Sequence, residues 1–478
     1  MIVDICAAAE RGAALLRAAV ASGELPAAAF GVASVGDGFE FTEATGFADL
    51  STSRSASPTT PFCLASTTKP ITSTVVGALV DLGRLRLDDQ AASLVLELPR
   101  PLAAFDDPTI RQLANHTAGV GAHHRFFYED ERPPIALRDA VGTLGRPAFP
   151  TGWAWRYSNL GYGALQVALE RAGGAPMADL VRDHIFRPLG MSDSAWGGLT
   201  GPAGSAVRYG VDRQPYLGYV TDHPSASEAW CSIIDLLEFG KAHACASLLR
   251  KGTHAELTTP SAPRQPDGAE YALGWVTREY EGIRILVHGG RMGGVGAHLT
   301  VVPEMGLVVA GLANIETDRL SEAVATVLAA TVPSYASPTP SAPWPVGPAH
   351  PLLAARWDGV AKYGDDELPV VLDATGDRIT LSHSGITVDV VMPCLQPDRV
   401  AGHANLTVRH PLVPPTSICH IDLLPAMEVA GRPVPVEPGS APSVLVGALT
   451  SAQYPNAQRT RQGDAISAAV LLHRTHRT

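Results

Sequence analysis

The chain has 478 residues, a length that favours two domains over one. Hydrophobic residues make up 46% of it and charged residues 17%, which excludes a disordered chain. The net charge of −11 argues against a nucleic-acid partner, because contacts with phosphates require a basic surface.

Apolar periodicity predicts strands near both ends of the first two thirds of the chain, with helices between them. The expected elements, in chain order, are a helix at 4–21, strands at 27–35 and 39–48, helices at 163–174 and 232–244, strands at 284–288, 297–303 and 307–314, and a helix at 320–332. This arrangement predicts an α+β fold with one antiparallel sheet, built from both ends of the domain and flanked by helices, and a helical subdomain inserted between them.

The rest of the chain indicates a second domain. Residues 334–351 are dense in proline and serine, which is typical of a linker, so we expect a first domain at 1–333. Residues 352–478 alternate strand-like pieces with turn residues and predict a small β-rich domain. We expect its last ~20 residues to fray.

Compartment and cofactors can be addressed from composition. Asp4, Glu10 and Arg11 break the apolar start of the chain, so we expect no signal peptide. No apolar stretch approaches ~20 residues, so we expect no membrane span. The six cysteines form no Cys-x-x-Cys pair, which favours reduced thiols, a cytoplasmic location and no metal site.

The first candidate for chemistry is Ser66-x-x-Lys69. Apolar residues after it fall on one helical face and Gly83 supplies a stop, so Ser66 is predicted at a helix N-terminus with Lys69 one turn later on the same side. A serine needs a neighbour to take its proton. Arginine cannot do so, whereas a buried lysine with a lowered pKa can. Lysine is scarce in this arginine-rich chain, which fits a base; the alternative is an N-cap serine followed by a solvated lysine.

Two further motifs follow in the chain. Tyr157-Ser158-Asn159 lies in a loop that enters a helix, and its alternative reading is a buried tyrosine beside a turn-forming asparagine. His288-Gly289-Gly290 is expected to end an apolar strand, where the glycines would let a substrate approach the strand edge. The alternative for the glycines is a tight hairpin. They open no helix, which excludes a dinucleotide-binding loop.

In order and spacing, the three motifs together resemble the serine β-lactamase and penicillin-binding-protein superfamily, in its class C-like branch. That branch also contains D-stereospecific aminopeptidases and amidases, D,D-carboxypeptidases, esterases and transacylases. The segments 109–120, 185–196 and 271–276 are similar to further landmarks of the family, and the resemblance covers roughly residues 10–332. It implies a β-lactamase/transpeptidase-like fold for the first domain. The C-terminal domain resembles the small β-barrel domains that are appended to several of these hydrolases, so we expect it to be barrel-like and to cap or narrow the active-site cleft.

The resemblance also implies roles. Ser66 would be the acylated nucleophile and Lys69 its partner and acylation base. Tyr157 would pass a proton to the leaving group and later activate the acceptor, and Asn159 would bind substrate and orient Lys69. The backbone N–H groups of Ser66 and of Arg291, which follows Gly289 and Gly290, would form an oxyanion hole, where losing one donor typically costs ~2.7–4 kcal/mol.

One motif departs from the family pattern. Its β-lactamases usually carry Lys-Thr-Gly where this chain has His288-Gly289-Gly290. The missing positive charge weakens recognition of a substrate carboxylate and argues against β-lactam hydrolysis as the main activity. His288 could instead tune the proton on Tyr157, and Gly289 leaves room beside it.

We therefore expect a serine acyl-enzyme hydrolase or transacylase that acts on a small ester or amide, with water, an amine or an alcohol resolving the acyl-enzyme, in natural-product biosynthesis for example. The alternatives are a D-stereospecific aminopeptidase, amidase or D,D-carboxypeptidase, and a penicillin-binding sensor that does not turn over. No cofactor is expected, and the sequence leaves the oligomeric state open.

Weaker candidates have structural interpretations. We expect His116 to be structural. His123 and His124 have no carboxylate or cysteine at ligand spacing, so a metal site there is not expected. The polar loop 128–131 is either a substrate contact or a solvated loop.

Overall fold

The structure is a computed structural model. It describes residues 2–101, 105–130, 133–265, 268–337, 351, 353–363, 365–375, 379–383, 386–396, 399–405, 418–429, 432–436, 440–452 and 465–475. Residues 338–350, which make up most of the linker expected at 334–351, lie outside the described residues.

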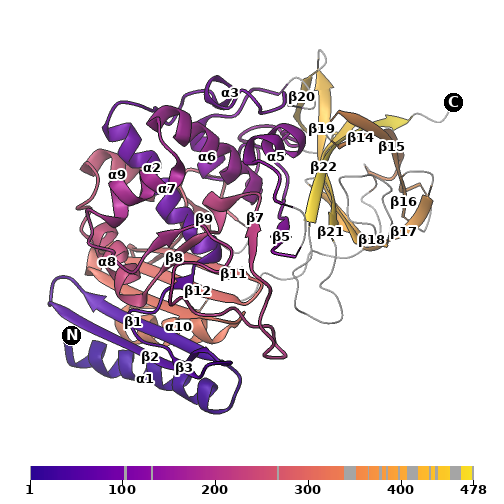
Figure 1. The fold of residues 1–478 in the computed structure, drawn as a ribbon. Helices are drawn as coiled ribbons and strands as arrows, with labels where there is room; N and C mark the ends of the chain where they lie inside the picture. The colour runs from indigo at the N-terminus through magenta and orange to yellow at the C-terminus, as the bar shows by residue number, and fades with distance from the viewer. Residues whose placement is uncertain are drawn as a thin grey trace.

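The first part of the chain is built on an eight-stranded antiparallel sheet (Figure 1). Its order is β3 (Arg54–Ser55), β2 (Phe39–Asp49), β1 (Ala27–Ser34), β13 (Leu307–Ala313), β12 (Val295–Val302), β11 (Ile283–Met292), β10 (Val276–Tyr280) and β9 (Glu270–Tyr271). Ala28 pairs with Ala313, so strands from the two ends of this part lie side by side. The expected antiparallel α+β sheet is confirmed.

Helices cover both faces of this sheet because β1 is apolar on both sides. Ala28 and Phe30 pack in a cluster with α1 (Ile2–Ala21) and α10 (Arg319–Thr331), whereas Ala29 belongs to the core on the opposite face. On that opposite face α8 (Ile233–Ala244) packs so close that a Cβ at Gly31 would lie 2.7 Å from Leu237. Figure 1 shows α1 and α10 together on one side of the sheet.

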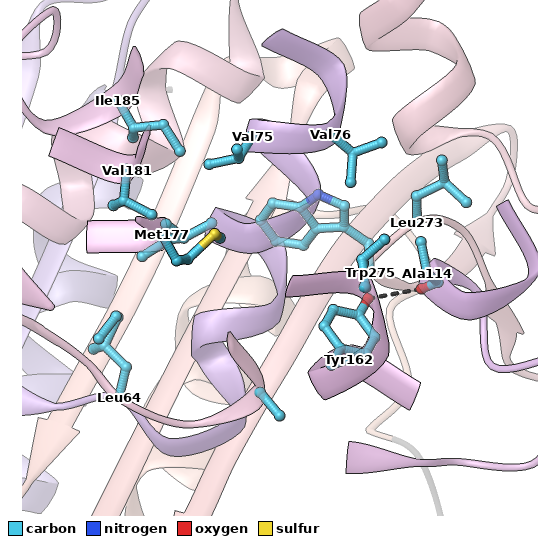
Figure 2. Close-up of a cluster of buried hydrophobic side chains, with 14 of the residues drawn as sticks. Leu64, Val75, Val76, Ala114, Tyr162, Met177, Val181, Ile185, Leu273 and Trp275 are labelled. Carbon is cyan, nitrogen blue, oxygen red and sulfur yellow. Dashed lines mark hydrogen bonds between the residues drawn. The ribbon is translucent and has the colours of Figure 1, made fainter. Parts of the chain in front are cut away.

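The helical insertion surrounds α2 (Thr68–Asp81), which is buried on nearly all sides. Val75 and Val76 of α2 lie in one apolar cluster with Trp275, and Tyr162 donates a hydrogen bond to the Ala114 carbonyl at 2.7 Å beside them (Figure 2). A helix enclosed in this way rarely buries a charged residue unless that residue is functional, and Lys69 is the charged residue that α2 buries; Asp81, at its C-terminal end, is partly exposed.

The remaining elements, most of them short, complete this part. They are β4 (Phe62–Cys63), η1 (Ala65–Thr67), α3 (Ala91–Leu94), α4 (Ile110–Ala114), β5 (Phe126–Tyr128), α5 (Leu137–Leu144), α6 (Asn159–Gly173), α7 (Met177–Val181), η2 (Arg182–Phe186), β6 (Ala195–Trp196), β7 (Tyr219–Thr221), η3 (Pro224–Ala226), β8 (Ala229–Cys231), α9 (Lys251–Thr258) and η4 (Pro303–Met305). Across the described residues, we find no helix with the length and apolarity that a membrane crossing requires.

The C-terminal part is β-rich, as expected, and has a hydrophobic core of its own. Its strands pair in the order β18 (Arg399–Asn405), β17 (Ile386–Gln396), β16 (Thr380–His383), β15 (Asp366–Asp373), β14 (Arg356–Tyr363), β22 (Ala465–Thr475), β21 (Val444–Ala452), β19 (Ile418–Val429) and β20 (Arg432–Pro435). Because β18 also pairs with β19, the sheet curls back on itself.

The expected fraying of the last ~20 residues is wrong for much of that segment. Residues 465–475 form β22, which pairs with β14 on one side and with β21 on the other. Ala468, Val470 and Leu472 alternate into the core of this part. The apolar run between the two polar stretches thus outweighs the polar residues that suggested a frayed end.

Candidate active site

Ser66 lies at a tight turn between β4 and α2. Ala65, which precedes it, has φ 45° and therefore occupies the left-handed region, where a residue with a Cβ is strained. The turn continues as η1 and then as α2, so Ser66 stands at the N-terminal end of a helix, as the sequence predicts. Ser66 is partly exposed, while Lys69 is fully buried behind it.

The Lys69 amine is surrounded by oxygen atoms. Nζ lies 3.1 Å from Ser66 Oγ, 2.8 Å from Asn159 Oδ1 and 3.1 Å from the carbonyl oxygen of Ala226. Burial lowers the pKa of Lys69 well below its usual value, which favours a neutral amine. A neutral amine has two hydrogens, which the Asn159 and Ala226 oxygens can accept. Its lone pair then faces Ser66 Oγ, ready to take the hydroxyl proton.

Tyr157 approaches Ser66 from the other side. Its phenol donates a hydrogen bond to Ser66 Oγ at 2.8 Å. Burial raises the pKa of Tyr157 far above its ordinary value, so this group is a neutral phenol and a proton donor at physiological pH. Ser66 Oγ therefore lies between a proton acceptor and a proton donor, which is the arrangement that attack and leaving-group protonation require.

Asn159 is the first residue of α6, and Ser158 caps that helix by accepting from Gly161 N–H at 3.0 Å. The Asn159 amide is held at both ends, because Nδ2 donates to the His123 carbonyl at 3.1 Å while Oδ1 accepts from Lys69. This bond fixes which end of the amide faces the lysine.

The third motif lies within a strand and does not end one. β11 runs from Ile283 to Met292, four residues past the expected end at 288, because it goes on pairing with β12. β10 pairs with β11 only as far as Val287, so the β10-facing edge of Gly289 to Met292 is not covered by that strand. Thr67, next to Ser66, donates to the His288 carbonyl at 3.2 Å and ties η1 to this edge.

The His288 ring is buried, and both of its nitrogens have hydrogen-bond partners. Its Nε2 lies 3.2 Å from the Tyr271 hydroxyl and its Nδ1 2.8 Å from the Gly289 carbonyl. Burial lowers the pKa of His288 to about 3, so the ring is neutral at physiological pH. The His288-Gly289-Gly290 motif thus supplies no fixed positive charge.

The two glycines of this motif have different surroundings. A Cβ at Gly290 would lie 2.0 Å from the Leu64 carbonyl oxygen, whereas a Cβ at Gly289 would meet only the Ala297 carbonyl oxygen at 3.9 Å. Gly290 therefore lets β11 approach the turn that carries Ser66. Arg291 is exposed and its side chain pairs with Asp318, which leaves its backbone as the part nearest the motif.

Other residues of the site were not given a catalytic role by the sequence. Ala226 contributes only a carbonyl group, which no side-chain motif can reveal. Tyr271 begins the segment 271–276, which is similar to a landmark of the family. That similarity was the signal that could have pointed to this tyrosine as a site residue. His116 was expected to be structural; its ring lies 4.4 Å from that of Tyr157, and its Nδ1 accepts from Ser158 N–H at 3.1 Å.

The polar loop at 128–131 takes structural contacts where it is described. Tyr128 is buried in an apolar cluster, and the Glu129 carboxylate accepts from Gly218 N–H at 3.2 Å. Glu131 lies outside the described residues.

The structure brings a carboxylate to His123 that the local sequence does not show. Asp222 Oδ2 lies 2.9 Å from His123 Nε2, and Asp222 Oδ1 lies 2.8 Å from His223 Nδ1. The three side chains are buried, with ligand atoms within 4.8 Å of one another, close enough to hold a metal ion. In this structure Asp222 joins the two histidines by hydrogen bonds, His123 Nδ1 is buried without a hydrogen-bond partner among the described residues, and the His123 backbone carbonyl accepts from Asn159 Nδ2.

Glu228, between this cluster and β8, provides a test of the buried charges. Burial raises its pKa from 4.5 to about 7, although its carboxylate accepts from the Thr221 hydroxyl at 2.8 Å. The folded protein thus retains a proton that the unfolded chain releases, so its stability should fall by about 3 kcal/mol as the pH rises from below 4.5 to above 7.

We expect Glu228→Gln to remove that part of the pH dependence. Urea unfolding at pH 4.5 and pH 8 gives, for each protein, the loss in the free energy of unfolding between the two pH values. The loss in the parent minus the loss in Glu228→Gln is the contribution of Glu228. Glu304→Gln, on an exposed turn, is the control and should lose as much stability as the parent. Equal losses in the parent and in Glu228→Gln would contradict a protonated buried Glu228.

Comparison with known proteins gives a consistent result. The Beta-lactamase family model matches residues 13–332. A D-aminopeptidase from Cereibacter sphaeroides is 27% identical over 418 residues, 82% of this chain and 76% of that protein. Penicillin-binding protein 4 from Amycolatopsis lactamdurans is 26% identical and covers 67% of this chain and 91% of its own.

Three further matches differ in how much of each chain they cover. An unguisins hydrolase from Aspergillus campestris is 28% identical over 313 residues, so this chain spans 56% of that relative's length. The crystal structure of SurE matches with a TM-score of 0.64 at 24% identity, over 99% of both chains, and a class C beta-lactamase matches with a TM-score of 0.58 over 69% of this chain and 97% of its own at 19% identity. These structures establish a shared fold.

Proposed function

The chain belongs to the β-lactamase family of serine hydrolases, and from this premise we propose that it forms an acyl-enzyme on Ser66 from small esters or amides. The observation that carries the proposal is the position of Ser66 Oγ, 3.1 Å from the Lys69 amine and 2.8 Å from the Tyr157 phenol. A serine placed between a base and an acid in this way is equipped for acyl transfer.

The proposed reaction has two halves. Ser66 Oγ attacks the carbonyl carbon while its proton passes to Lys69, and the backbone N–H groups of Ser66 and Arg291 receive the oxyanion. Tyr157 gives its proton to the leaving amine or alcohol and regains one from Lys69. In the second half, water, an amine or an alcohol loses a proton to the same pair and attacks the acyl carbon, and Ser66 leaves with a proton restored to Oγ.

Intact-protein mass spectrometry after treatment with a fluorophosphonate tests this proposal. We expect one adduct, located on Ser66 by peptide mapping and absent from Ser66→Ala. Ser93→Ala, on the short helix α3, is the matched control and should be labelled as the parent is. A parent protein without an adduct on Ser66 would overturn the proposal.

For the substrate, we favour an amide or ester whose acyl residue has the D configuration. Support comes from the D-aminopeptidase relative, because that match extends past residue 333 into the β-rich part. The neutral His288 supports an ester or amide substrate in place of a β-lactam, since it offers no charge for a carboxylate. Side-by-side rates on D- and L-amino acid amides, p-nitrophenyl esters and nitrocefin test this preference, and faster nitrocefin turnover would contradict it.

Hydrolysis and transacylation differ in what meets the acyl-enzyme. Product ratios from a simple ester, measured across amine concentrations, separate the two. Aminolysis that saturates with the amine indicates an acceptor site and supports a transacylase. Rapid turnover of any ester would exclude the remaining alternative, a penicillin-binding sensor that is acylated and does not turn over.

A further inference from the structure

Tyr157 follows a segment that has little regular structure of its own. Between Gly145 and Ser158 the chain forms no helix and makes a single isolated bridge, from Pro147 to Val120. The phenol at the end of this segment nevertheless lies 2.8 Å from Ser66 Oγ. Placement at hydrogen-bond accuracy requires external support, because a loop alone does not fix a side chain to that degree.

One support comes from Arg156, immediately before Tyr157. Its Nε lies 2.9 Å from Asp422 Oδ2, on β19 of the C-terminal sheet, and both side chains are largely shielded from solvent, at 17% and 25% exposure. The Arg156 N–H donates to the His116 carbonyl at 2.8 Å. The residue before the phenol is thus held by both parts of the chain.

A second support comes from Ser158, immediately after Tyr157. Its hydroxyl donates to the Gly121 carbonyl at 2.9 Å. Ser467 on β22 donates to the next carbonyl, that of Ala122. A Cβ at Gly121 would lie 2.7 Å from Ser467 Cβ, so this glycine lets the strand come close. The residue after the phenol therefore rests on a loop that is itself tied to the C-terminal sheet.

Apolar contacts also join the loop before Tyr157 to the C-terminal sheet. Phe149 packs with Ala448 and Ala469, and a Cβ built on Gly447 would lie 2.8 Å from its ring. Trp153 packs against a group of buried apolar residues on β19 and β21, which are Ala426, Val444 and Val446. The loop is thus fixed along its length by the C-terminal sheet, from Phe149 to Arg156.

We propose that the C-terminal sheet positions Tyr157 for catalysis, with Arg156, Asp422 and Ser467 as positioning residues. This inference rests on the proposed function, in which Tyr157 is the proton donor. It predicts that the sheet controls the rate of Ser66 acylation, in addition to any effect that it has on the width of the cleft. Loss of the Arg156–Asp422 pair should leave the probe's binding intact and slow its reaction.

A double-mutant cycle in the full chain tests this inference, with a fluorophosphonate as the probe. Samples quenched at set times and analysed by intact-protein mass spectrometry give the rate at which the probe modifies Ser66, which stands for the acylation rate. We expect Arg156→Gln and Asp422→Asn each to lower the maximal acylation rate about 10-fold, with the half-saturating probe concentration unchanged. The double variant should be no slower than either single variant, because both remove one interaction. Arg156→Asp combined with Asp422→Arg should recover most of the rate.

The control is Asp106→Asn, which breaks another ion pair between the two parts, that of Arg432 and Asp106, at an exposed position. Its acylation rate should equal the parent's. Ser467→Ala removes a second polar contact between the C-terminal sheet and the surroundings of Tyr157, the hydrogen bond to the Ala122 carbonyl. It should slow acylation without moving the unfolding midpoint of the first part.

Two outcomes overturn the inference. Single variants that acylate at the parent's rate, or effects that multiply in the double variant, would contradict it while the proposed function stands. A parent that the probe does not label at all would overturn the proposed function and this inference together.

Discussion

Lys69→Arg is expected to lower the rate of Ser66 acylation by about 10³- to 10⁴-fold while the protein stays folded. The substitution keeps a nitrogen-bearing side chain of similar length but replaces the neutral amine with a fixed positive charge that cannot accept a proton, because a guanidinium does not deprotonate in proteins. The lone pair that faces Ser66 Oγ at 3.1 Å would be lost. Rapid-quench labelling with a fluorophosphonate measures the rate, and circular dichroism reports the fold.

The matched control is Lys241→Arg. Lys241 lies on α8 and pairs with Glu40 and Glu238, a role that arginine fills equally well, so its rate should equal the parent's. A rate for Lys69→Arg within 10-fold of the parent would contradict a base at this position.

The pH profile provides a second readout of the same lysine. Acylation requires the neutral amine, so its rate should rise with pH and level off above the pKa of Lys69. Burial lowers that pKa well below the ordinary lysine value of 10.5, so the inflection should fall well below 10.5. An inflection near 10.5 would contradict a neutral Lys69 at physiological pH.

Gly290→Ala is expected to slow acylation by about 100-fold and to destabilise the protein by about 1–3 kcal/mol. The added Cβ would lie 2.0 Å from the Leu64 carbonyl oxygen, so β11 and the turn carrying Ser66 must move apart. That movement displaces the N–H of Arg291 on β11, one of the two proposed oxyanion donors, from Ser66. Acylation kinetics and urea unfolding measure the two effects.

Gly289→Ala is the neighbouring control. Its Cβ would have 3.9 Å to the nearest atom, so we expect a folded protein with an acylation rate within a few-fold of the parent's. Equal losses in the two variants would show that the motif tolerates no side chain at either position, and would contradict a specific role for the Leu64 contact.

The sequence predicted the local part of the site well and the non-local part poorly. Ser66 and Lys69 lie one helical turn apart, a spacing that periodicity resolves. Asn159 begins α6 behind a serine cap, which is also a local signal. Ala226, in contrast, contributes a backbone carbonyl through tertiary packing, and no residue pattern encodes it.

The same distinction holds for the fold. The antiparallel sheet follows from apolar strands at both ends of the first part. The length of β11, however, depends on its pairing with β12, and β22 forms a strand because it pairs with both β14 and β21. His123 was considered without a carboxylate because Asp222 is distant in sequence and adjacent only in the fold. Contacts of this kind appear only once the chain is folded.

The pairing of β1 with β13 has a consequence for biosynthesis. Ala28 pairs with Ala313, which is synthesised much later. At ribosomal rates of about 5–20 residues per second, the interval between the synthesis of the two residues lasts roughly 15 to 60 s. During it, the apolar β1 can form its hairpin with β2, but its other edge has no native partner. Nascent chains are therefore most vulnerable to aggregation before β13 emerges, and chaperone binding should be greatest in that interval.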